Sequence, residues 1–546
     1  MDRSWTGAIS SPTRPIPTRS TSIVRAGGRL DRFGVPAILA CASGLLFFWN
    51  LGRGSLQDWD EATYAEIARE IRVFHDWLHL HWNYVPWFNK PPLYIWLTAG
   101  LFHFGASAFW ARAVSALAAV GVVLITYAIG RRFYGRLAGV TAAVVTCSCY
   151  QVLAAARFGT SDMLLTFFLY ATLYAYLEAR DRPSWWYAVG TFTGLAIMTK
   201  GPAALVAPAA IVVTLLIDRR LGATVRMRQL WVGVGLTLAI ALPWHILSYL
   251  YYGPAFFNQY LGTMVLARVG QPIEGHDGDL FTYLGYLRNQ FFPWAYVVPF
   301  ALLAFAWHRP RARDGSWVIV VFPAIVLALY TIVQTKLVWY ILPVYPALAI
   351  LVGALLVRAV RGELVALLAI GIALLAALVS VPSSLDPVPP LLILALTGVV
   401  AILVTRSRAL KAAFAPALVG AVAVFFLATV GLRSADLYTS GDLPVVSIGK
   451  SARAAVMGRP VGLVLFIADA AQATDFDVSH SLLFYSHRPV HVAIGTAELK
   501  QAVGCRAHDV VLAVEDLPSV PRDYQLSTVR EKAPLIHVAA HRVAGC

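Results

Sequence analysis

The chain has 546 residues, of which 58% are hydrophobic and only 13% are charged, and its mean hydropathy is +0.66. Soluble proteins carry about 25% charged residues, so this composition excludes an ordinary soluble protein and indicates a polytopic membrane protein. The net charge is +15. Because much of that excess lies in short loops, we interpret it as a topology signal and not as a nucleic-acid-binding surface.

The first 32 residues are rich in Arg, Ser and Pro and contain no apolar run, so we expect a disordered cytoplasmic tail without a separate cleavable signal. A membrane span needs about 20 apolar residues, and residues 33–433 contain thirteen candidates for a transmembrane domain. These lie near 33–51, 108–130, 137–156, 162–179, 185–199, 201–217, 229–250, 289–307, 316–334, 338–357, 363–382, 387–405 and 412–432. The fifth and sixth are short and separated only by Lys200-Gly201-Pro202, so they could instead form one bent element.

Basic residues test this count. With the N-terminus inside, the tail and every alternate loop together contain 23 Arg and Lys residues, whereas the short loops on the other side contain only Arg157, Lys200 and Lys336. This is the pattern of the positive-inside rule, and it supports thirteen spans. It also predicts that two long loops, residues 52–91 and 251–287, and the C-terminal region lie on the outer side.

The first outer loop is unusually polar for this chain. We expect a helix to begin there, with Asp58 or Asp60 as its cap. Ile67, Ile71 and Phe74 follow at a spacing that gives one apolar face. The loop therefore predicts an amphipathic helix that lies along the membrane surface.

From about residue 434 the composition changes to short apolar runs that alternate with helix-like segments. This alternation predicts a small α/β domain over residues 434–546, which the loop charges place on the outer side of the membrane. The expected strands are Val461–Ile467, Val490–Ile494 and Val510–Val514, and the expected helices are Ser479–Ser486 and Thr496–Ala502. Cys505 and Cys546 form either a disulfide or two free thiols, whereas Cys41, Cys147 and Cys149 lie in apolar segments and are expected to be inert.

Ionisable and aromatic residues from distant parts of the chain all fall in the outer loops or at the outer ends of spans. They are the carboxylates Asp60, Glu61 and Asp162, the cations Lys90, Lys200, Arg268 and Lys336, and also Tyr64, Tyr340 and His276. Charges near a membrane are costly and indicate function, so their convergence on one face predicts a single outward-facing site. The alternative for the carboxylates is helix capping, and for the lysines it is snorkelling to the interface.

Glu274-x-His276 has half of a metal-binding pattern, which is weak evidence for a divalent metal, and we assign no metal ligand. Cations at a membrane boundary suit the phosphate of a lipid carrier. A carboxylate beside them could orient or deprotonate an acceptor, or bind an amine on a sugar. The sequence has neither a Walker motif nor a dinucleotide-binding fingerprint, so use of ATP or of a nucleotide sugar is not supported.

Six stretches carry a resemblance to a known family. They are DWDEATYAEIARE, WFNKPPLYIW, FGTSDMLL, MTKGPAAL, ALPWHIL and TKLVWYILPVYP. Together, over about residues 33–350, they resemble the lipid A aminoarabinose transferases (the ArnT family), which belong to the protein-O-mannosyltransferase-like GT-C glycosyltransferases.

The resemblance implies an α-helical GT-C membrane protein with about thirteen spans, outer juxtamembrane helices and a small C-terminal α/β domain. It implies an inverting pentosyltransferase of the bacterial inner membrane, acting as a monomer and without a confidently assigned cofactor. The donor would be undecaprenyl phosphate carrying 4-amino-4-deoxy-L-arabinose, and the acceptor a lipid A phosphate at the periplasmic face. The modified lipopolysaccharide would give resistance to polymyxin and other cationic peptides.

The resemblance also implies roles for individual residues. Asp60 lies at the position of the family's central acidic residue, with Glu61 beside it, and Asp162 matches a second acidic position. Lys90, Arg268 and Lys336 would bind the donor phosphate, while Tyr64, Tyr340, His276 and Lys200 would contact substrate. One departure is Asn89, because many aminoarabinose transferases have Glu directly before Lys90, where it could contact the sugar amine.

Two other functions compete with this one. A GT-C transferase could use a polyprenyl-phosphate sugar on a protein or another glycan, with the same chemistry and a different product. A lipid transporter would instead favour charges at mid-membrane and broken helices, whereas here the charges gather at the outer boundary.

Overall fold

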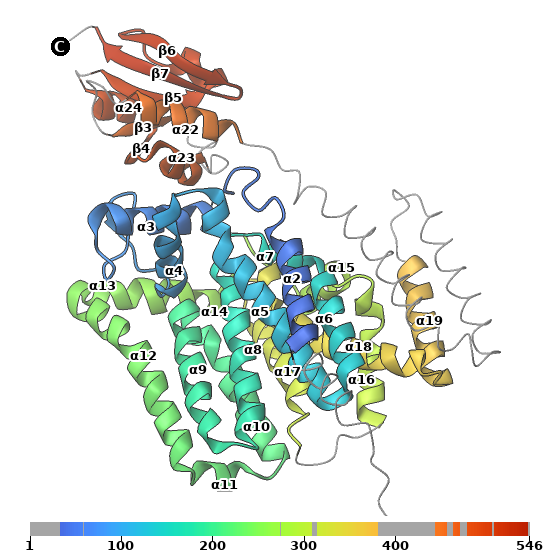
Figure 1. Ribbon diagram of the computed structural model, residues 1–546. Helices are drawn as coiled ribbons and strands as arrows, with labels where there is room; N and C mark the ends of the chain where they lie inside the picture. The colour runs from blue at the N-terminus through green and yellow to red at the C-terminus, as the bar shows by residue number, and fades with distance from the viewer. Residues whose placement is uncertain are drawn as a thin grey trace, which may run out of the picture.

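The structure is a computed structural model with a helical body and a small sheet at one end (Figure 1). It describes residues 33–57, 59–273, 275–307, 314–379, 443–455, 462–469, 478–504 and 507–543. The expected N-terminal tail, the twelfth and thirteenth expected spans, Cys505 and Cys546 lie outside the described residues. Within them, the chain is mostly helical, as predicted.

The body has helices in the expected apolar segments that the structure describes, and further helices in the loops between them. They are α2 (Val35–Phe48), α3 (Asp60–Phe74), α4 (Leu93–Leu101), α5 (Ala108–Tyr134), α6 (Arg136–Ser148), α7 (Tyr150–Ala156), α8 (Ser161–Ala179), α9 (Trp186–Lys200), α10 (Val206–Ile217), α11 (Leu221–Val225), α12 (Arg228–Tyr252), α13 (Pro254–Phe257), α14 (Arg268–Gly270), α15 (Thr282–Gln290), α16 (Val298–Trp307), α17 (Val318–Ile332), α18 (Val344–Val360) and α19 (Leu364–Val379). A π-helix, η5 (Asn258–Ala267), joins α13 to α14. A two-stranded ribbon of β1 (His81–Trp82) and β2 (Val85–Pro86) lies in the first outer loop.

Among the described residues, three helical stretches are long and apolar enough to cross a membrane: Ala108–Tyr134, Arg228–Tyr252 and Pro183–Ile217, the last of which contains both α9 and α10. A fourth is obtained if α6 and α7, bent by 69° at their junction, count as one span. Several further helices are apolar but shorter. The short apolar helix α4 was not among the expected spans.

The expected fifth and sixth spans, α9 and α10, run in opposite directions. Lys200, at the end of α9, pairs with Asp162 at the start of α8. Asp218, directly after α10, pairs with Arg180 directly after α8, at 2.7 Å. Because α10 begins beside one end of α8 and finishes beside the other, the chain reverses at Lys200-Gly201, where Gly201 has φ +59°. The pair is therefore a hairpin and not one bent element.

Close approach of helix backbones requires glycine at the contact between α9 and α12. A Cβ atom built on Gly190 would lie 1.9 Å from the carbonyl oxygen of Gly233. The Thr237 hydroxyl also donates to the Gly190 carbonyl oxygen at 2.9 Å. Small residues with a polar contact are typical of helix pairs inside membranes, and this pair holds α12 against the body.

Helix α3 forms where the sequence predicts it, but its surroundings differ from the expected membrane-surface helix. Side chains from Glu61 to Ile71 are buried, on the polar face as well as on the apolar face. Its polar face is buried because internal partners satisfy its charges, as in the Glu66–Arg69 ion pair at 2.5 Å. The helix begins with Asp60, and Trp59 is its N-cap residue.

The C-terminal residues form the small α/β unit that the sequence predicts. Its strands are β3 (Leu463–Ile467), β4 (Val490–Ile494), β5 (His508–Ala513), β6 (Tyr524–Lys532) and β7 (Leu535–Arg542), and its helices are α22 (Pro444–Ala454), α23 (Val478–Ser486) and α24 (Gly495–Val503). The sheet order is β4-β3-β5-β7-β6, with β3 parallel to β4 and β5. The antiparallel β6–β7 hairpin was not predicted.

This α/β unit docks on the first outer loop (Figure 1). The Asn83 side chain donates to the Val490 carbonyl oxygen at 2.7 Å and accepts from its N–H at 2.9 Å. His480 of α23 stacks on both Trp59 and Trp82, with ring centroids 5.3 and 5.0 Å away. The contacts thus reach the residue directly before Asp60.

Candidate active site

Asp60 and Lys90 form an ion pair within the first outer loop. The Lys90 ammonium lies 3.2 Å from each Asp60 carboxylate oxygen. It also donates to the Tyr64 hydroxyl, one helical turn after Asp60. Pro91 and Pro92 follow Lys90 and lead into α4, which fixes the backbone that presents the lysine. The Asp60 side chain is 39% exposed and that of Lys90 24%, so both can meet a ligand.

A second ion pair joins α8 and α9. Lys200 donates to the Asp162 carboxylate, and its ammonium lies 5.5 Å from the centre of the Tyr340 ring. These three residues line a narrow cavity with Tyr330 and Trp339. The Asp162 carboxylate binds Lys200, so Asp162 is not simply a helix cap for α8.

The two ion pairs belong to one electrostatic group. Burial alone would raise the pKa of Asp60, but Lys90, Lys200 and Arg268 together hold that pKa below its ordinary value. Asp60 is therefore ionised at neutral pH. Within the described residues the group has three cations and two carboxylates, which leaves one net positive charge, suited to an anionic phosphodiester.

Glu61 lies beside Asp60 in the sequence but faces the protein interior. Its side chain is fully buried, and its oxygens accept from Arg112 at 2.8 and 3.0 Å. The backbone N–H groups of Gln57 and Gly159 also donate to it, at 2.8 and 2.7 Å. This is the environment of a structural ion pair, and it differs from the catalytic position expected for Glu61.

Arg112 is the residue that sequence reasoning missed. Besides Glu61, it donates to the carbonyl oxygens of Leu51, Arg53 and Ser55. It therefore ties the start of α5 to the segment that leads into α3. The signal was a single Arg near the start of an apolar span, and a charge in that position indicates a specific partner.

Lys336 and His276 belong to a neighbouring structure at the second outer loop. The Lys336 ammonium donates to the carbonyl oxygens of Tyr330, Thr331 and Val333, at the end of α17. Its backbone N–H donates to the His276 carbonyl oxygen at 2.9 Å, and the next residue back, Thr335, donates to Gln271. The backbone bonds attach the second outer loop to the end of α17. The Lys336 ammonium is engaged by the three carbonyl oxygens.

No group of three or more His, Cys, Asp and Glu side chains suited to a metal occurs among the described residues. Glu274, the partner of His276 in the half metal pattern, lies outside them.

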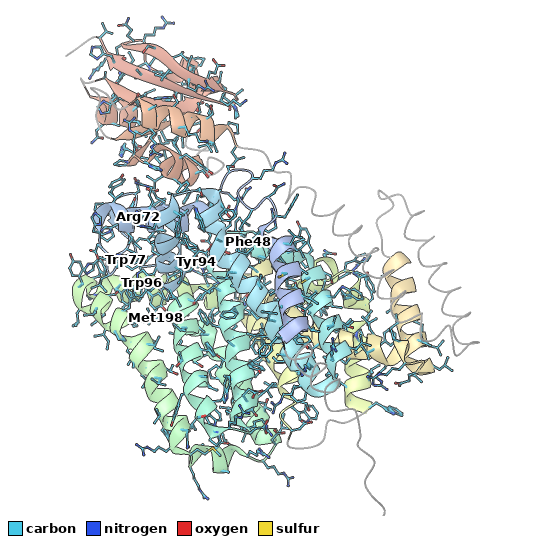
Figure 2. The ribbon with its side chains drawn as sticks, in the orientation of Figure 1. Phe48, Arg72, Trp77, Tyr94, Trp96 and Met198 are labelled. Carbon is cyan, nitrogen blue, oxygen red and sulfur yellow. The ribbon has the colours of Figure 1, made fainter. Side chains whose placement is uncertain are left out.

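Aromatic residues continue from the first outer loop down to α9 (Figure 2). The Trp96 indole donates to the Trp77 carbonyl oxygen at 2.6 Å. Trp96 also packs against a small cluster that includes Met198 and Trp244. Met198 lies two residues before Lys200, so this cluster forms an apolar wall close to the end of α9.

Comparisons with known proteins find one matching family model and several similar named proteins. Residues 89–247 match the family model described as dolichyl-phosphate-mannose-protein mannosyltransferase. Over 391 residues the chain is 29% identical to an undecaprenyl phosphate-alpha-4-amino-4-deoxy-L-arabinose arabinosyl transferase of Pseudomonas fluorescens, covering 67% of this chain and 66% of that protein. A transferase of the same name from Shewanella sediminis is 28% identical over 57% of each protein. The chain is thus similar in sequence to these aminoarabinose transferases.

Comparison with solved structures shows a matching fold. The fold matches ArnT from Cupriavidus metallidurans bound to undecaprenyl phosphate with a TM-score of 0.69 and 22% identity, over 93% of this chain and 98% of that one. The apo form of the same protein gives a TM-score of 0.70. The resemblance expected from the six sequence stretches is confirmed. The aligned region spans slightly less than two thirds of the first curated relative and 57% of the second.

Asn89, the departure from the pattern of the aminoarabinose transferases, has a partner here. Its side-chain oxygen accepts from the Gln259 side chain at 3.0 Å. Gln259 belongs to η5 in the second outer loop. This contact links the two long outer loops directly beside Lys90.

Proposed function

We propose that this chain is an integral-membrane glycosyltransferase that moves 4-amino-4-deoxy-L-arabinose from undecaprenyl phosphate to a lipid A phosphate. The observation that carries the proposal is the Asp60–Lys90 pair, held with Lys200 and Arg268 in one electrostatic group. Relatives bearing the name of this activity, and the matching fold, support it. The product would be a less anionic lipid A, which would weaken binding of polymyxin and other cationic peptides.

Lys90 and Arg268 would hold the donor phosphate. A single positive net charge on the group matches the single negative charge of a sugar-phosphate diester. When the anomeric carbon–oxygen bond breaks, the phosphate leaves with the bonding electron pair and becomes more negative. Lys90 and Arg268 would stabilise this developing charge, an electrostatic contribution that is often the largest in catalysis.

Asp60 would orient the sugar. Because it stays ionised, it can bind an ammonium group such as that of an amino sugar. The attacking oxygen of a lipid A phosphate is already ionised, so the reaction needs little general-base catalysis. That oxygen would form the new bond at the anomeric carbon from the face opposite the leaving phosphate, with inversion and no covalent enzyme intermediate.

Asp162, Lys200 and Tyr340 would form the second side of the site. Asp162 neutralises part of the Lys200 charge, and the narrow cavity beside them is bounded by aromatic rings. We propose that these residues contact the reacting sugar or its phosphate. Glu61 and Lys336, by contrast, would support the two outer loops through Arg112 and through the end of α17.

We propose that the chain has thirteen spans and lies in the bacterial inner membrane, with the active site and the α/β unit on the periplasmic side. The alternation of basic and non-basic loops supports this topology. The α9–α10 hairpin supports it too, because two passes there preserve the parity of the count. The last two spans of the set lie outside the described residues.

A second candidate function is the transfer of a polyprenyl-phosphate-linked sugar to a protein or another glycan. The Asn89–Gln259 contact supports this second function. A carboxylate before Lys90 could contact a sugar amine, whereas this amide is neutral. The same residues would bind the donor phosphate in both functions, so only the identity of the modified product separates them.

The test is mass spectrometry of lipid A from a bacterial host that makes the aminoarabinose donor and lacks its own transferase. The host would express the full chain, Asp60→Asn or Lys90→Ala at matched membrane levels. We expect the aminoarabinose adduct with the natural sequence and at least a tenfold loss with either variant. Unmodified lipid A with a well-expressed natural chain would reject the proposed acceptor or sugar and favour the second candidate.

Two matched control variants distinguish the effect of removing any charged side chain from the effect of removing a site residue. Glu531→Gln removes an exposed carboxylate on β6, and Lys450→Ala removes an exposed ammonium on α22. Both should retain full transfer. A loss with these controls equal to that with the site variants would indicate a general effect of charge on folding or insertion.

A further inference from the structure

The π-helix η5 leads directly into Arg268. Two residues near its start contact the segments that carry Lys90 and Lys200, so this one helix touches the chain beside all three cations of the candidate active site. Extended π-helices are rare, and π-helical turns are frequent at functional sites. The placement of η5 therefore bears on how these cations are spaced.

Tyr260 fixes the start of η5 beside Lys200. Its side chain is 4% exposed, and its hydroxyl lies 3.1 Å from Nε2 of His245 on α12. Nδ1 of that ring lies 2.7 Å from the Ala241 carbonyl oxygen, which only accepts, so Nδ1 carries the hydrogen and the neutral ring accepts from Tyr260. The hydroxyl also lies against Gly201, the residue after Lys200, because a Cβ atom built there would be 2.3 Å from it. Tyr260 thus holds η5 against the end of α9.

The far end of η5 is fixed as well. The backbone N–H of Thr335, which follows α17, donates to the Arg268 carbonyl oxygen at 3.2 Å. Because η5 is held both at Tyr260 and at Arg268, it forms a fixed support for the side chains that it presents.

Gln259 connects this support to the segment that carries Lys90. Its side chain is half-buried and donates to the Asn89 side-chain oxygen at 3.0 Å. Phe88, the residue before Asn89, packs against the apolar cluster that includes Tyr260. The chain that approaches Lys90 is therefore held by a hydrogen bond to η5 and also by apolar packing.

The backbone around Lys90 is restrained on both sides. Pro91 and Pro92 limit the conformation of the chain that follows it, and the hydrogen bond from Gln259 restrains Asn89, which precedes it. Cations that bind one phosphate must keep their spacing, because a misplacement of about 1 Å is enough to weaken catalysis strongly.

We propose that Gln259 is a positioning residue for Lys90. Through Asn89 it sets the place of the Lys90 ammonium relative to the other two cations, so that a single lipid phosphate meets all three. The inference rests on the proposed function, because it takes the phosphate of the lipid carrier as the ligand. It predicts that loss of the Asn89–Gln259 contact weakens recognition of the phosphate and not of the lipid tail.

The test measures binding of undecaprenyl phosphate and of undecaprenol, which has the same tail without the phosphate, to the full chain by native mass spectrometry in detergent. We expect the natural chain to prefer undecaprenyl phosphate, and Gln259→Met to reduce this preference about fivefold, as for the loss of one hydrogen bond. Gln259→Asn, whose amide is one methylene shorter, should show a similar loss. Adding Asn89→Gln to Gln259→Asn should restore the preference, because the exchanged pair has the same combined length.

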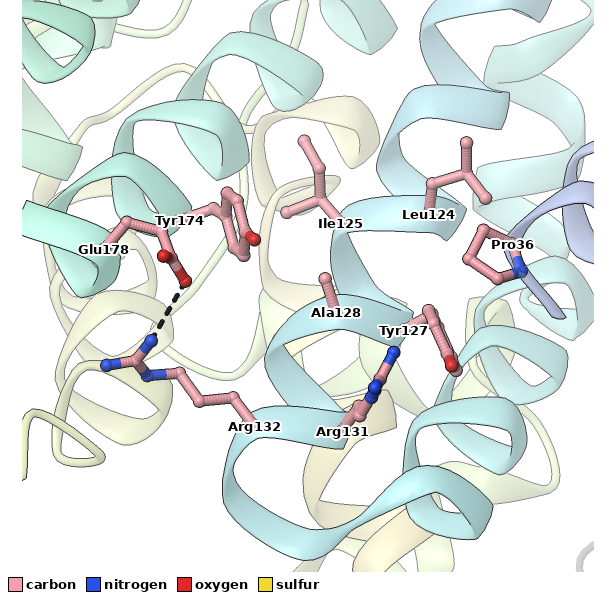
Figure 3. Close-up of a pocket in the computed structure, with 9 residues that line it drawn as sticks. All are labelled: Pro36, Leu124, Ile125, Tyr127, Ala128, Arg131, Arg132, Tyr174 and Glu178. Atoms are coloured by element: carbon pink, nitrogen blue, oxygen red, sulfur yellow. Dashed lines mark hydrogen bonds and ion pairs between the residues drawn. The ribbon is translucent and has the colours of Figure 1, made fainter. Parts of the chain in front are cut away.

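Two controls separate positioning from a general loss of stability. Gln501→Met makes the same chemical change at an exposed position on α24. Leu124→Ala removes apolar contacts beside a cavity of about 450 Å³ between α2, α5 and α8 (Figure 3) and should lower stability. Neither control should change the ratio of the two affinities.

An unchanged ratio in both Gln259→Met and Gln259→Asn would overturn the inference and leave the proposed function standing. Equal loss of both lipids, or no restoration by the exchanged pair, would show that Gln259 supports the fold without positioning Lys90. A natural chain that binds the two lipids equally would reject the phosphate site itself, and with it the proposed donor and this inference. Because neither probe carries a sugar, transfer of another sugar or to another acceptor leaves the result unaffected.

Discussion

Replacing Arg112 by Met tests whether the ion pair with Glu61 holds the loop that carries Asp60. The Glu61 side chain is 0% exposed and that of Arg112 is 8% exposed. Removal of one partner from a buried pair leaves an uncompensated charge and costs about 3–5 kcal/mol. Three backbone carbonyls, those of Leu51, Arg53 and Ser55, also lose their donor. We therefore expect a loss near the upper part of this range.

The assay is equilibrium unfolding in mixed detergent micelles, followed by tryptophan fluorescence. The Glu61→Gln single variant and the Glu61→Gln/Arg112→Met double variant complete a mutant cycle. Because the two residues interact directly, we expect the double variant to be more stable than the sum of the single effects predicts, by about 2 kcal/mol. Arg226→Met, at an exposed position, should change stability by no more than about 0.5 kcal/mol. A loss below about 1 kcal/mol for Arg112→Met, or additive effects in the cycle, would refute the reasoning.

Three further predictions follow from described contacts. Lys200→Met should lower transfer at least tenfold in membranes, because Asp162 loses its partner and the site loses a cation; unchanged transfer would remove Lys200 from the site. Burial, and then the charge of a neighbouring carboxylate on α3, raise the pKa of Glu70 above its ordinary 4.5. The folded form thus binds this proton more tightly, so stability should fall as pH rises above about 4.5, and Glu70→Gln should remove that fall in thermal melts between pH 5 and 8. Gly190→Val should separate α9 from α12, because its side chain would meet Gly233; a melting temperature equal to that of the natural chain would contradict the close approach.

Local sequence patterns could predict the parts of the fold that depend on neighbours in the chain. The apolar run of Ala108–Tyr134 and the alternation around Leu463–Ile467 both gave the right kind of element. Several residues of the candidate site could also be predicted, because charged residues at the outer ends of spans are rare. Asp60, Lys90, Asp162 and Lys200 do come together as two ion pairs.

Pairing over long distances could not be predicted from the same patterns. Asp60 and Glu61 are adjacent acidic residues with similar sequence context. Glu61 faces the interior because it pairs with Arg112, 51 residues later. Helix α3 was expected at the membrane surface because its apolar face was visible in the sequence. The protein partners that cover its polar face were not. Lys336 likewise has the sequence context of a ligand-binding residue, but its ammonium donates hydrogen bonds to three nearby backbone carbonyl oxygens.

The contact between Asn83 and Val490 has a consequence for how the protein is made. These two residues are 407 positions apart, so the ribosome must continue for roughly 20–80 s after the first outer loop emerges before its partner strand exists. During that interval Trp59 and Trp82 cannot yet stack on His480. In a newly inserted chain the first outer loop would therefore lack these contacts, and the α/β unit, which is made last, would complete them. Premature termination anywhere before β4 should yield an inserted but inactive protein.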